Sequence, residues 1–197
     1  LGLSQIAPAA ASAAGAKAHT EGAAAAAEAG AGWRAGVRAA CALNLLVLAV
    51  MFLKKLSVFE GNKNEMRERN LVAKIVARIP SSSEQFGLAA LRLLFNLSFD
   101  PAIREQMVKA GAIPKFVEML KHPRFRGVTL RLLYHLSVDD RCKSLFTYTE
   151  AIPITMQLVI KFPQNRIARE LGALAVNLSL NARNAELMCG NKGLYHL

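Results

Sequence analysis

The sequence predicts an all-α solenoid, a stack of similar helical units, because three kinds of marker recur on one period of about 40 residues. An apolar run ends in a Leu-Ser pair four times, and the serines lie 41, 39 and 42 residues apart at Ser57, Ser98, Ser137 and Ser179. The motif 111–114 (Gly-Ala-Ile-Pro) returns as 150–153 (Glu-Ala-Ile-Pro). A proline follows the next apolar run at Pro80, Pro123 and Pro163. Stacked units of this kind carry their function on one long surface.

Residues 1–42 differ in composition from the rest of the chain. Nineteen of them are Ala and six are Gly, with Trp33 the only aromatic residue. Side chains this small bury little apolar area against the entropy of ordering the chain. We therefore expect a disordered segment or the product of an incorrect gene model over 1–42, and the repeat region over 43–197. The chain also begins with Leu, and we expect it to be a fragment.

The longest apolar run, Cys41–Leu53, follows Arg34 and Arg38 and is similar to the core of a signal peptide or a shortened membrane span. Its 13 residues are fewer than the roughly 20 that a span requires. The run also leads into Leu56-Ser57, in phase with the repeats. We interpret it as the inner helix of a partly preserved unit, and predict a soluble protein without a transmembrane segment.

The clearest unit follows Ser98. Asp100 and the proline after it predict a helix start that runs to about Ala110, and Gly111 supplies the turn that ends the helix. A second helix has Pro114 in its first turn and ends at Pro123. A third helix, from about Phe125 to Leu136, is apolar nearly all round and is therefore expected to be buried between units.

The other units repeat this plan. Before the clearest unit we expect helices over Asn62–Arg69, Leu71–Ile79 and Ser83–Leu97. After it, Asp139 caps a short helix to Tyr148, followed by helices over Ile152–Lys161 and Asn165–Leu178. A further unit begins with Ala182–Cys189 and continues into 193–197. Three helices per unit, with the third most buried, favour the armadillo type over two-helix repeats. The prediction is a right-handed armadillo-type α-solenoid of about three full and two partial repeats.

The charge is strongly positive: 25 Lys and Arg against 14 Asp and Glu give a net charge of +11. This balance favours acidic partners such as tubulin-like surfaces, acidic protein tails, nucleic acid or anionic lipid. The charges are spread singly along the helices, which is more typical of ordinary solvated faces. The three cysteines, Cys41, Cys142 and Cys189, form no closely spaced pair and predict a reducing compartment.

The residue types of an enzyme are missing from the pattern. The four histidines are scattered without ligand partners at helical spacing, so no metal site is expected. The Gly-Asn-Lys stretches at 61–63 and 190–192 lack the spacing of a phosphate-binding loop. We predict no catalytic residues, no cofactor and no small-molecule substrate.

One constellation is a candidate for partner binding. The residue before each Leu-Ser pair is polar on an otherwise apolar helix; we call Lys55, Asn96, His135 and Asn177 the polar ladder. Equivalent positions of a solenoid line up along its concave groove, where Asn amides can hydrogen-bond the backbone of an extended peptide. Arg92 and Arg131, one helical turn earlier, add positive charge. The alternative is that these side chains bridge neighbouring helices.

Particular strings carry a family resemblance over about residues 51–197. They include Phe-Leu-Lys-Lys-Leu-Ser at 52–57, Arg-Leu-Leu-Phe-Asn-Leu-Ser-Phe-Asp at 92–100 and Leu-Tyr-His-Leu-Ser-Val-Asp-Asp-Arg at 133–141. In these strings the chain resembles the kinesin-associated protein family, the non-motor subunits of heterotrimeric kinesin-II. General armadillo proteins share only the Gly-Ala-Ile-Pro and Asn-Leu-Ser signatures. Residues 1 to about 40 match nothing in that family.

The resemblance implies a non-enzymatic adaptor that binds the tails of two kinesin-II heavy chains and couples the motor to cargo adaptors. It implies a cytoplasmic, cytoskeleton-associated protein that acts in intraflagellar transport in cilia and flagella. Two other classes stay open: an import-receptor or catenin-type peptide scaffold, and a basic scaffold for nucleic acid or membrane surfaces. Import receptors place Trp one turn before each groove Asn, whereas this chain has Met51, Arg92, Arg131 and Ala173 there.

Overall fold

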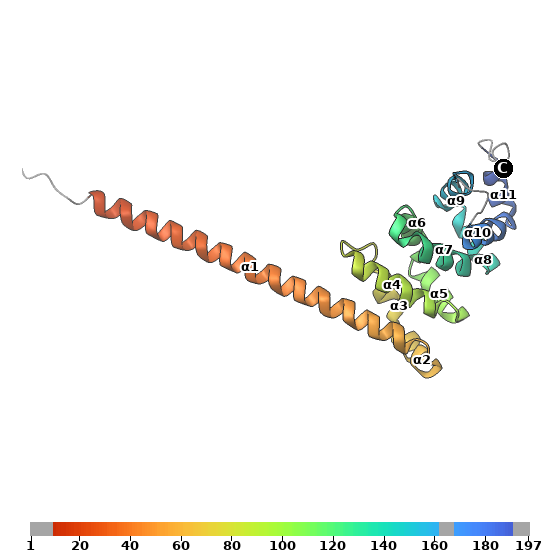
Figure 1. Cartoon of the computed structure of the whole chain (residues 1–197), viewed down its shortest axis with the longest axis horizontal. Coiled ribbons are helices and arrows are strands. Elements are labelled where there is room, and N and C mark those ends of the chain that lie inside the picture. Colours follow the sequence, from red (N-terminus) through yellow and green to blue (C-terminus); the bar gives the residue numbers. More distant parts are fainter. Residues whose placement is uncertain (1–9, 162–167, 191–197) are drawn as a thin grey trace, which may run out of the picture. The chain divides into compact units, whose positions relative to one another are not determined.

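The computed structural model describes residues 10–161 and 168–190, and every regular element in those ranges is an α-helix. This confirms the predicted all-α class. The chain divides into two compact units, residues 1–46 and 47–197, and Figure 1 labels the helices in chain order. The helices are α1 (Ala10–Leu56), α2 (Glu60–Glu68), α3 (Leu71–Val76), α4 (Glu84–Leu97), α5 (Pro101–Lys109), α6 (Ala112–Leu120), α7 (Pro123–Ser137), α8 (Asp140–Phe146), α9 (Ala151–Ile160), α10 (Arg169–Ser179) and α11 (Ala182–Cys189).

The helix α1 includes residues 10–42, for which the sequence predicts disorder. All side chains from Ala31 to Ala40 are exposed, so tertiary burial does not hold this part of the helix together. Alanine has the highest intrinsic helix propensity, which gives a physical reason for a helix in this composition. The boundary between the two units also falls inside α1, after Leu46, four residues later than the predicted boundary at 42.

Part of α1 is long and apolar enough to cross a membrane. Within the described residues, the stretch Ala31–Leu56 has 26 residues and contains an 18-residue window with a mean hydropathy of 2.1. The apolar run Cys41–Leu53 is short for a span, but the continuous helix lengthens it with Ala and Gly. Length and composition are the only grounds here, and core helices and signal sequences meet them too. The absence of a transmembrane segment stays a prediction.

The remaining helices form three consecutive triplets, in agreement with the expected repeat plan. They are α2–α4, α5–α7 and α8–α10, preceded by the end of α1 and followed by α11. Each triplet has a first helix, a second helix and a longer third helix, and we use these terms below. The structure therefore contains three full and two partial repeats in the described part of the chain.

Helix ends follow the local sequence signals. The Asp100 carboxylate accepts a hydrogen bond from the backbone N–H of Ala102 at 2.8 Å and caps α5, where the sequence predicts a cap. Gly111 lies between α5 and α6 with φ of 70°, a left-handed conformation that glycine adopts without strain. Pro123 begins α7, which therefore starts two residues earlier than predicted, because proline is well suited to the first position of a helix.

The core runs through the array along the third helices. The helix α7 packs against α4 of the preceding repeat, against α6 of its own, and against α10 of the following one. Its side chains Leu132, Leu133 and Leu136 are fully buried. Burial on both sides explains why the apolar pattern of α7 extends nearly all round the helix.

The third helix of the last full repeat begins at Arg169 in the structure, whereas the prediction begins at Asn165. Residues 165–167 and the predicted continuation at 193–197 lie outside the described residues. The expected helix Ala182–Cys189 agrees with α11 residue for residue.

Candidate functional site

The polar ladder lies on the third helices, one residue per repeat. Lys55 is near the end of α1, and Asn96, His135 and Asn177 are near the ends of α4, α7 and α10. Lys55 is exposed, and the other three side chains are half-buried. The structure therefore assigns the four residues to equivalent places in four successive repeats.

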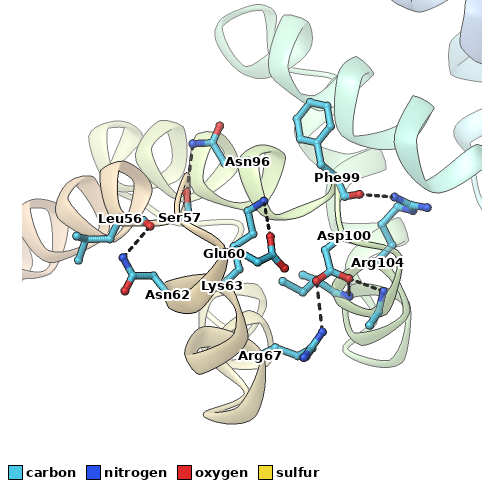
Figure 2. Close-up of polar contacts among 12 residues, drawn as sticks. Leu56, Ser57, Glu60, Asn62, Lys63, Arg67, Asn96, Phe99, Asp100 and Arg104 are labelled. Carbon is cyan, nitrogen blue, oxygen red and sulfur yellow. Dashed lines mark hydrogen bonds and ion pairs between the residues drawn. The ribbon is translucent and has the colours of Figure 1, made fainter.

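Asn96 connects its helix to the end of α1. Its Nδ2 lies 3.2 Å from the backbone oxygen of Lys54 and 3.2 Å from Oγ of Ser57, and donates to both. Figure 2 shows the amide pointing toward Ser57. Both hydrogens of this amide are therefore used within the repeat array.

The next two members make the same kind of contact. His135 Nδ1 lies 2.6 Å from Oγ of Ser98, and Asn177 Nδ2 lies 3.0 Å from Oγ of Ser137. Each ladder residue from the second to the fourth thus bonds to the serine that ends the third helix of the preceding repeat. Three of the four ladder residues therefore form polar–serine pairs between successive repeats, and Lys55 does not.

The direction of these hydrogen bonds follows from the serines. Each hydroxyl donates to the backbone oxygen three residues earlier, at 2.7 Å for Ser57, Ser98 and Ser137. A hydroxyl has a single hydrogen, so each serine acts as an acceptor toward the ladder residue. His135 must then donate from Nδ1, and in the neutral ring Nε2 is left as an acceptor.

The surroundings of His135 favour the neutral ring. It stacks on Phe95 with ring centroids 5.1 Å apart and meets Phe99 edge-on at 4.6 Å. Burial lowers the pKa of His135, and the nearby positive charge of Arg104 lowers this pKa further. These effects favour the neutral ring, and the bond to Ser98 selects the tautomer with the proton on Nδ1.

The two arginines of the candidate set differ in their contacts. Arg131 on α7 forms an ion pair with Glu170 on α10, with Nε 3.0 Å from Oε1. The pKa of Glu170 is lowered by a hydrogen bond from its own backbone N–H and by Arg131. Arg92 on α4 is exposed and makes no ion pair within the described residues. Arg131 therefore bridges two repeats, and Arg92 faces solvent.

Of the two sequence-based alternatives, the contacts correspond to bridging between neighbouring helices. The structure brings Asn96, His135 and Asn177 together with the serines. Lys55 and Arg92 make no such bridge. None of these contacts tests whether the four ladder residues, Arg92 and Arg131 bind a partner. Partner binding at this surface stays a prediction.

The serines and Arg104 also belong to this surface, although the sequence pattern does not mark them as candidate site residues. Arg104 on α5 donates to the backbone oxygens of Ser98 and Phe99, at 2.8 and 3.3 Å, and fixes the turn beside His135. Figure 2 shows the Phe99 ring pointing away from that carbonyl contact. The repeated Leu-Ser pair could have pointed to them. A serine that recurs at the same position of each repeat, at the end of an apolar helix, needs hydrogen-bond partners for its hydroxyl group.

Other side chains also bond across repeats. Gln106 donates to the backbone oxygen of Arg67 at 3.0 Å, and Lys115 donates to that of Val76 at 2.6 Å. Asn184, fully buried, donates to the backbone oxygen of Lys143 at 2.9 Å. Inter-repeat polar contacts are therefore a general feature of this array.

An open pocket of about 680 Å³ lies between the second and third helices of the last two full repeats. Its lining is mostly apolar but contains Lys121, Arg126 and Lys161, and it includes none of the ladder residues. No group of His, Cys, Asp or Glu able to hold a metal ion occurs among the residues that the structure describes.

Comparison with known proteins adds two findings. The sequence profile of the family described as Kinesin-associated protein (KAP) matches residues 38–197. Among solved structures, the crystal structure of an engineered protein is similar, with a TM-score of 0.66 and 14% sequence identity. That similarity covers 76% of this chain and 63% of the engineered one, and at this identity it supports the fold alone.

Proposed function

The chain belongs to the kinesin-associated protein family, and we propose that it is a non-enzymatic adaptor linking kinesin-II heavy-chain tails to cargo adaptors. The members of this family are kinesin-associated accessory proteins, so association with a kinesin follows from family membership. The adaptor role, the two heavy-chain tails and the setting of intraflagellar transport in cytoplasm and cilium are the proposed part. The observation that carries the proposal is the family match over 160 residues, 38–197.

The architecture supports an adaptor. A solenoid offers a long continuous surface in place of a single cleft, and such surfaces are suited to binding extended partners. The side chains of Asn96, His135 and Asn177 are hydrogen-bonded to the preceding repeat, so they hold the repeats of this surface together.

The electrostatics support an acidic partner. The net charge is +11, and Lys55 and Arg92 are exposed beside the polar ladder. We propose the six candidate residues, Lys55, Arg92, Asn96, Arg131, His135 and Asn177, as part of the partner-facing surface. Among them the exposed cations are expected to contribute most directly to binding, because the ladder amides and the histidine already have partners.

A peptide scaffold of the import-receptor or catenin type is the second candidate function. It shares the repeat architecture and the Asn positions. The hydrogen bonds of Asn96 to Lys54 and Ser57 disfavour it, because an amide used inside the array has no donor left for a peptide backbone. The family match favours the kinesin adaptor.

The test is to identify what co-purifies with the tagged endogenous protein from a ciliated or flagellated cell extract at moderate salt. Two different kinesin heavy chains in stoichiometric amounts are the expected result. Recovery of importin-β or cadherin-like tails without heavy chains would reject the kinesin adaptor and favour the second candidate. A direct assay then measures binding of the 197-residue chain to purified heterodimeric kinesin-II tails.

A further inference from the structure

Exposed apolar side chains are concentrated on the helix α1. Of the large apolar side chains that are exposed in the described residues, seven lie on this helix between Trp33 and Leu56. Single exposed apolar residues are ordinary on protein surfaces, whereas a contiguous exposed set indicates a binding surface.

Five of these side chains share one face of α1. At 3.6 residues per turn, their positions fall within an arc of about 100°. Their exposed fractions lie between 41% and 68%. We call this set the α1 stripe: Val37, Leu45, Leu48, Phe52 and Leu56. The opposite side of the helix carries Val47 and Val50, which are buried. The stripe therefore faces away from the side of α1 that is packed.

The stripe continues past the start of the repeat region. The compact unit that contains the repeats begins at residue 47, and none of the residues 31–46 is buried. Between residues 39 and 53 only Asn44 is polar. The most apolar 18-residue window of Ala31–Leu56 has a mean hydropathy of 2.1, and 6% of it is buried. A helix this apolar is normally covered by an apolar environment, either a protein core or lipid, and here the core covers little of it.

The charges of this stretch select an anionic environment. Residues 29–59 contain no Asp or Glu, and their four cations are Arg34, Arg38, Lys54 and Lys55. At helical spacing, all of these except Lys54 fall on the side of the stripe. The stems of such side chains lie against apolar surface while their charged ends reach the phosphates of lipid headgroups. Apolar side chains flanked by cations alone are typical of helices that bind anionic membranes.

The acids of the next helix do not cancel this charge. In α2, Glu60 and Glu65 form ion pairs with Lys63 and Arg69, and Figure 2 shows the Glu60 and Lys63 side chains pointing toward each other. Glu68 is the remaining acid of α2. The same charges disfavour a second copy of the chain as the cover of the stripe, because two stripes in contact would bring their cations together.

The dimensions favour binding at the surface over crossing the membrane. The uncharged stretch between Arg38 and Lys54 has 15 residues. At about 1.5 Å per residue it is about 22 Å long, whereas the hydrocarbon core is about 30 Å thick. A helix that lies in the plane of the membrane buries one face by about 5–10 Å.

We propose that α1 binds the surface of an anionic membrane through the α1 stripe, with Arg34, Arg38 and Lys55 on the lipid phosphates. The opposite side of the helix then continues to carry the repeats. This inference goes beyond the proposed function and does not depend on it.

The first test measures co-sedimentation of the 197-residue chain with phosphatidylcholine vesicles, with and without about 30% phosphatidylserine. Binding is expected to be at least about tenfold stronger to the anionic vesicles. The double variant Leu48→Ser/Phe52→Ser should bind them at least about tenfold more weakly, because two apolar side chains no longer enter the lipid. Val176→Ser is the matched control: Val176 is an equally exposed apolar residue on α10, and binding should stay within about twofold.

The contribution of charge is tested separately. Arg34→Gln/Arg38→Gln is expected to lower binding to the anionic vesicles by at least about tenfold and to leave binding to pure phosphatidylcholine unchanged. Arg34→Lys/Arg38→Lys keeps both charges and should bind within about threefold of the wild type. Equal binding by the Gln variant and the wild type would reject the role of the cations.

Trp33 reports the position of α1 in the lipid. It is the only tryptophan of the chain and is 74% exposed. Its fluorescence is therefore expected to shift to shorter wavelength on anionic vesicles. Lipids brominated near the headgroup end of the acyl chain should quench it more than lipids brominated near the chain end. Unchanged Trp33 fluorescence, equal binding by the double variant, or no binding to anionic vesicles would overturn the proposal.

Sedimentation velocity of the lipid-free chain tests the competing cover. A monomer is expected for the wild type and for the double variant. A wild-type dimer that becomes monomeric in the double variant would assign the stripe to a second copy and overturn the proposal.

Discussion

At the scale of single residues, the ladder pairs are the feature that most distinguishes this array. Ser57, Ser98 and Ser137 each donate to the backbone of their own helix and accept a bond from the following repeat. These side chains are half-buried or buried, so an unmade bond leaves a polar group partly desolvated. The ladder therefore stabilises the array because its hydrogen bonds form only when neighbouring repeats are correctly aligned.

Replacing Asn96 with Ala tests this contribution. The variant loses two hydrogen bonds, to Lys54 and Ser57, and we expect it to lower the free energy of unfolding by about 1–3 kcal/mol. Urea unfolding followed by circular dichroism measures the change. Arg92→Ala, one turn away and exposed, is the control and should change stability by no more than about 0.5 kcal/mol. An Asn96→Ala chain as stable as the control would contradict the bridging role.

His135 gives the ladder a pH dependence. Its pKa in the folded protein is lowered from the ordinary 6.5 by burial and by Arg104, so the unfolded chain binds a proton more readily. Its contribution is complete above about pH 6.5 and is lost as the pH falls below that value. We expect His135→Asn, which keeps a donor, to remove part of the stability loss between pH 7 and 5. Parallel thermal melts across this range measure it, and identical pH profiles for the two proteins would refute the assignment.

At the scale of elements, turn residues decide where each helix stops. Gly111, with φ of 70°, separates α5 from α6, and Asn70, with φ of 50°, takes the same left-handed conformation between α2 and α3. The equivalent Glu150 before α9 has φ of −74°. The same position of the repeat therefore has a positive φ in two repeats and a negative φ in the third. Only the positive-φ conformation favours glycine or asparagine.

Gly111→Ala tests the positive-φ turn. Space does not limit the substitution, since an added Cβ meets no atom within 4 Å; the strain is purely conformational. We expect a loss of about 1 kcal/mol. Gly127→Ala is a matched control inside α7, also with nothing within 4 Å, and should stabilise the helix by up to about 1 kcal/mol. Urea unfolding of both variants checks the opposite signs, and destabilisation of equal size in both would contradict the distinction.

At the scale of the whole molecule, stability is shared between neighbouring repeats. The helix α7 contacts third helices on both sides, so a defect in its core weakens two interfaces at once. Solenoids behave approximately as a sum of repeat and interface terms. The centre of the array is therefore expected to be the most sensitive to core substitutions.

Leu133→Ala tests the central interface. Leu133 is fully buried on α7, and we expect the substitution to cost about 2–5 kcal/mol through lost burial and the cavity left behind. Hydrogen exchange should show faster amide exchange on both sides, in α4 and α10. Val138→Ala, exposed at the end of the same helix, is the control. Faster exchange confined to α7 would show that its neighbours are stable without it.

The sequence by itself determined the helical class, the repeat count and most helix boundaries. These depend on local signals: apolar periodicity, the cap at Asp100, the turn at Gly111 and the recurring Leu-Ser pair. The family resemblance was likewise readable from short strings, and the match over 38–197 confirms it. Local signals sufficed because each helix of a repeat forms from residues adjacent in the chain.

Only the tertiary structure decided what the ladder residues contact. Asn96 and Ser57 are 39 residues apart, and no local pattern states that one repeat's amide meets the previous repeat's hydroxyl. The same holds for the exposure of Phe99 and Val138, since an apolar residue in a turn reads from sequence as a packed one. Contacts between repeats depend on the stagger of one helix layer on the next, and that stagger is fixed by side-chain packing across the whole interface.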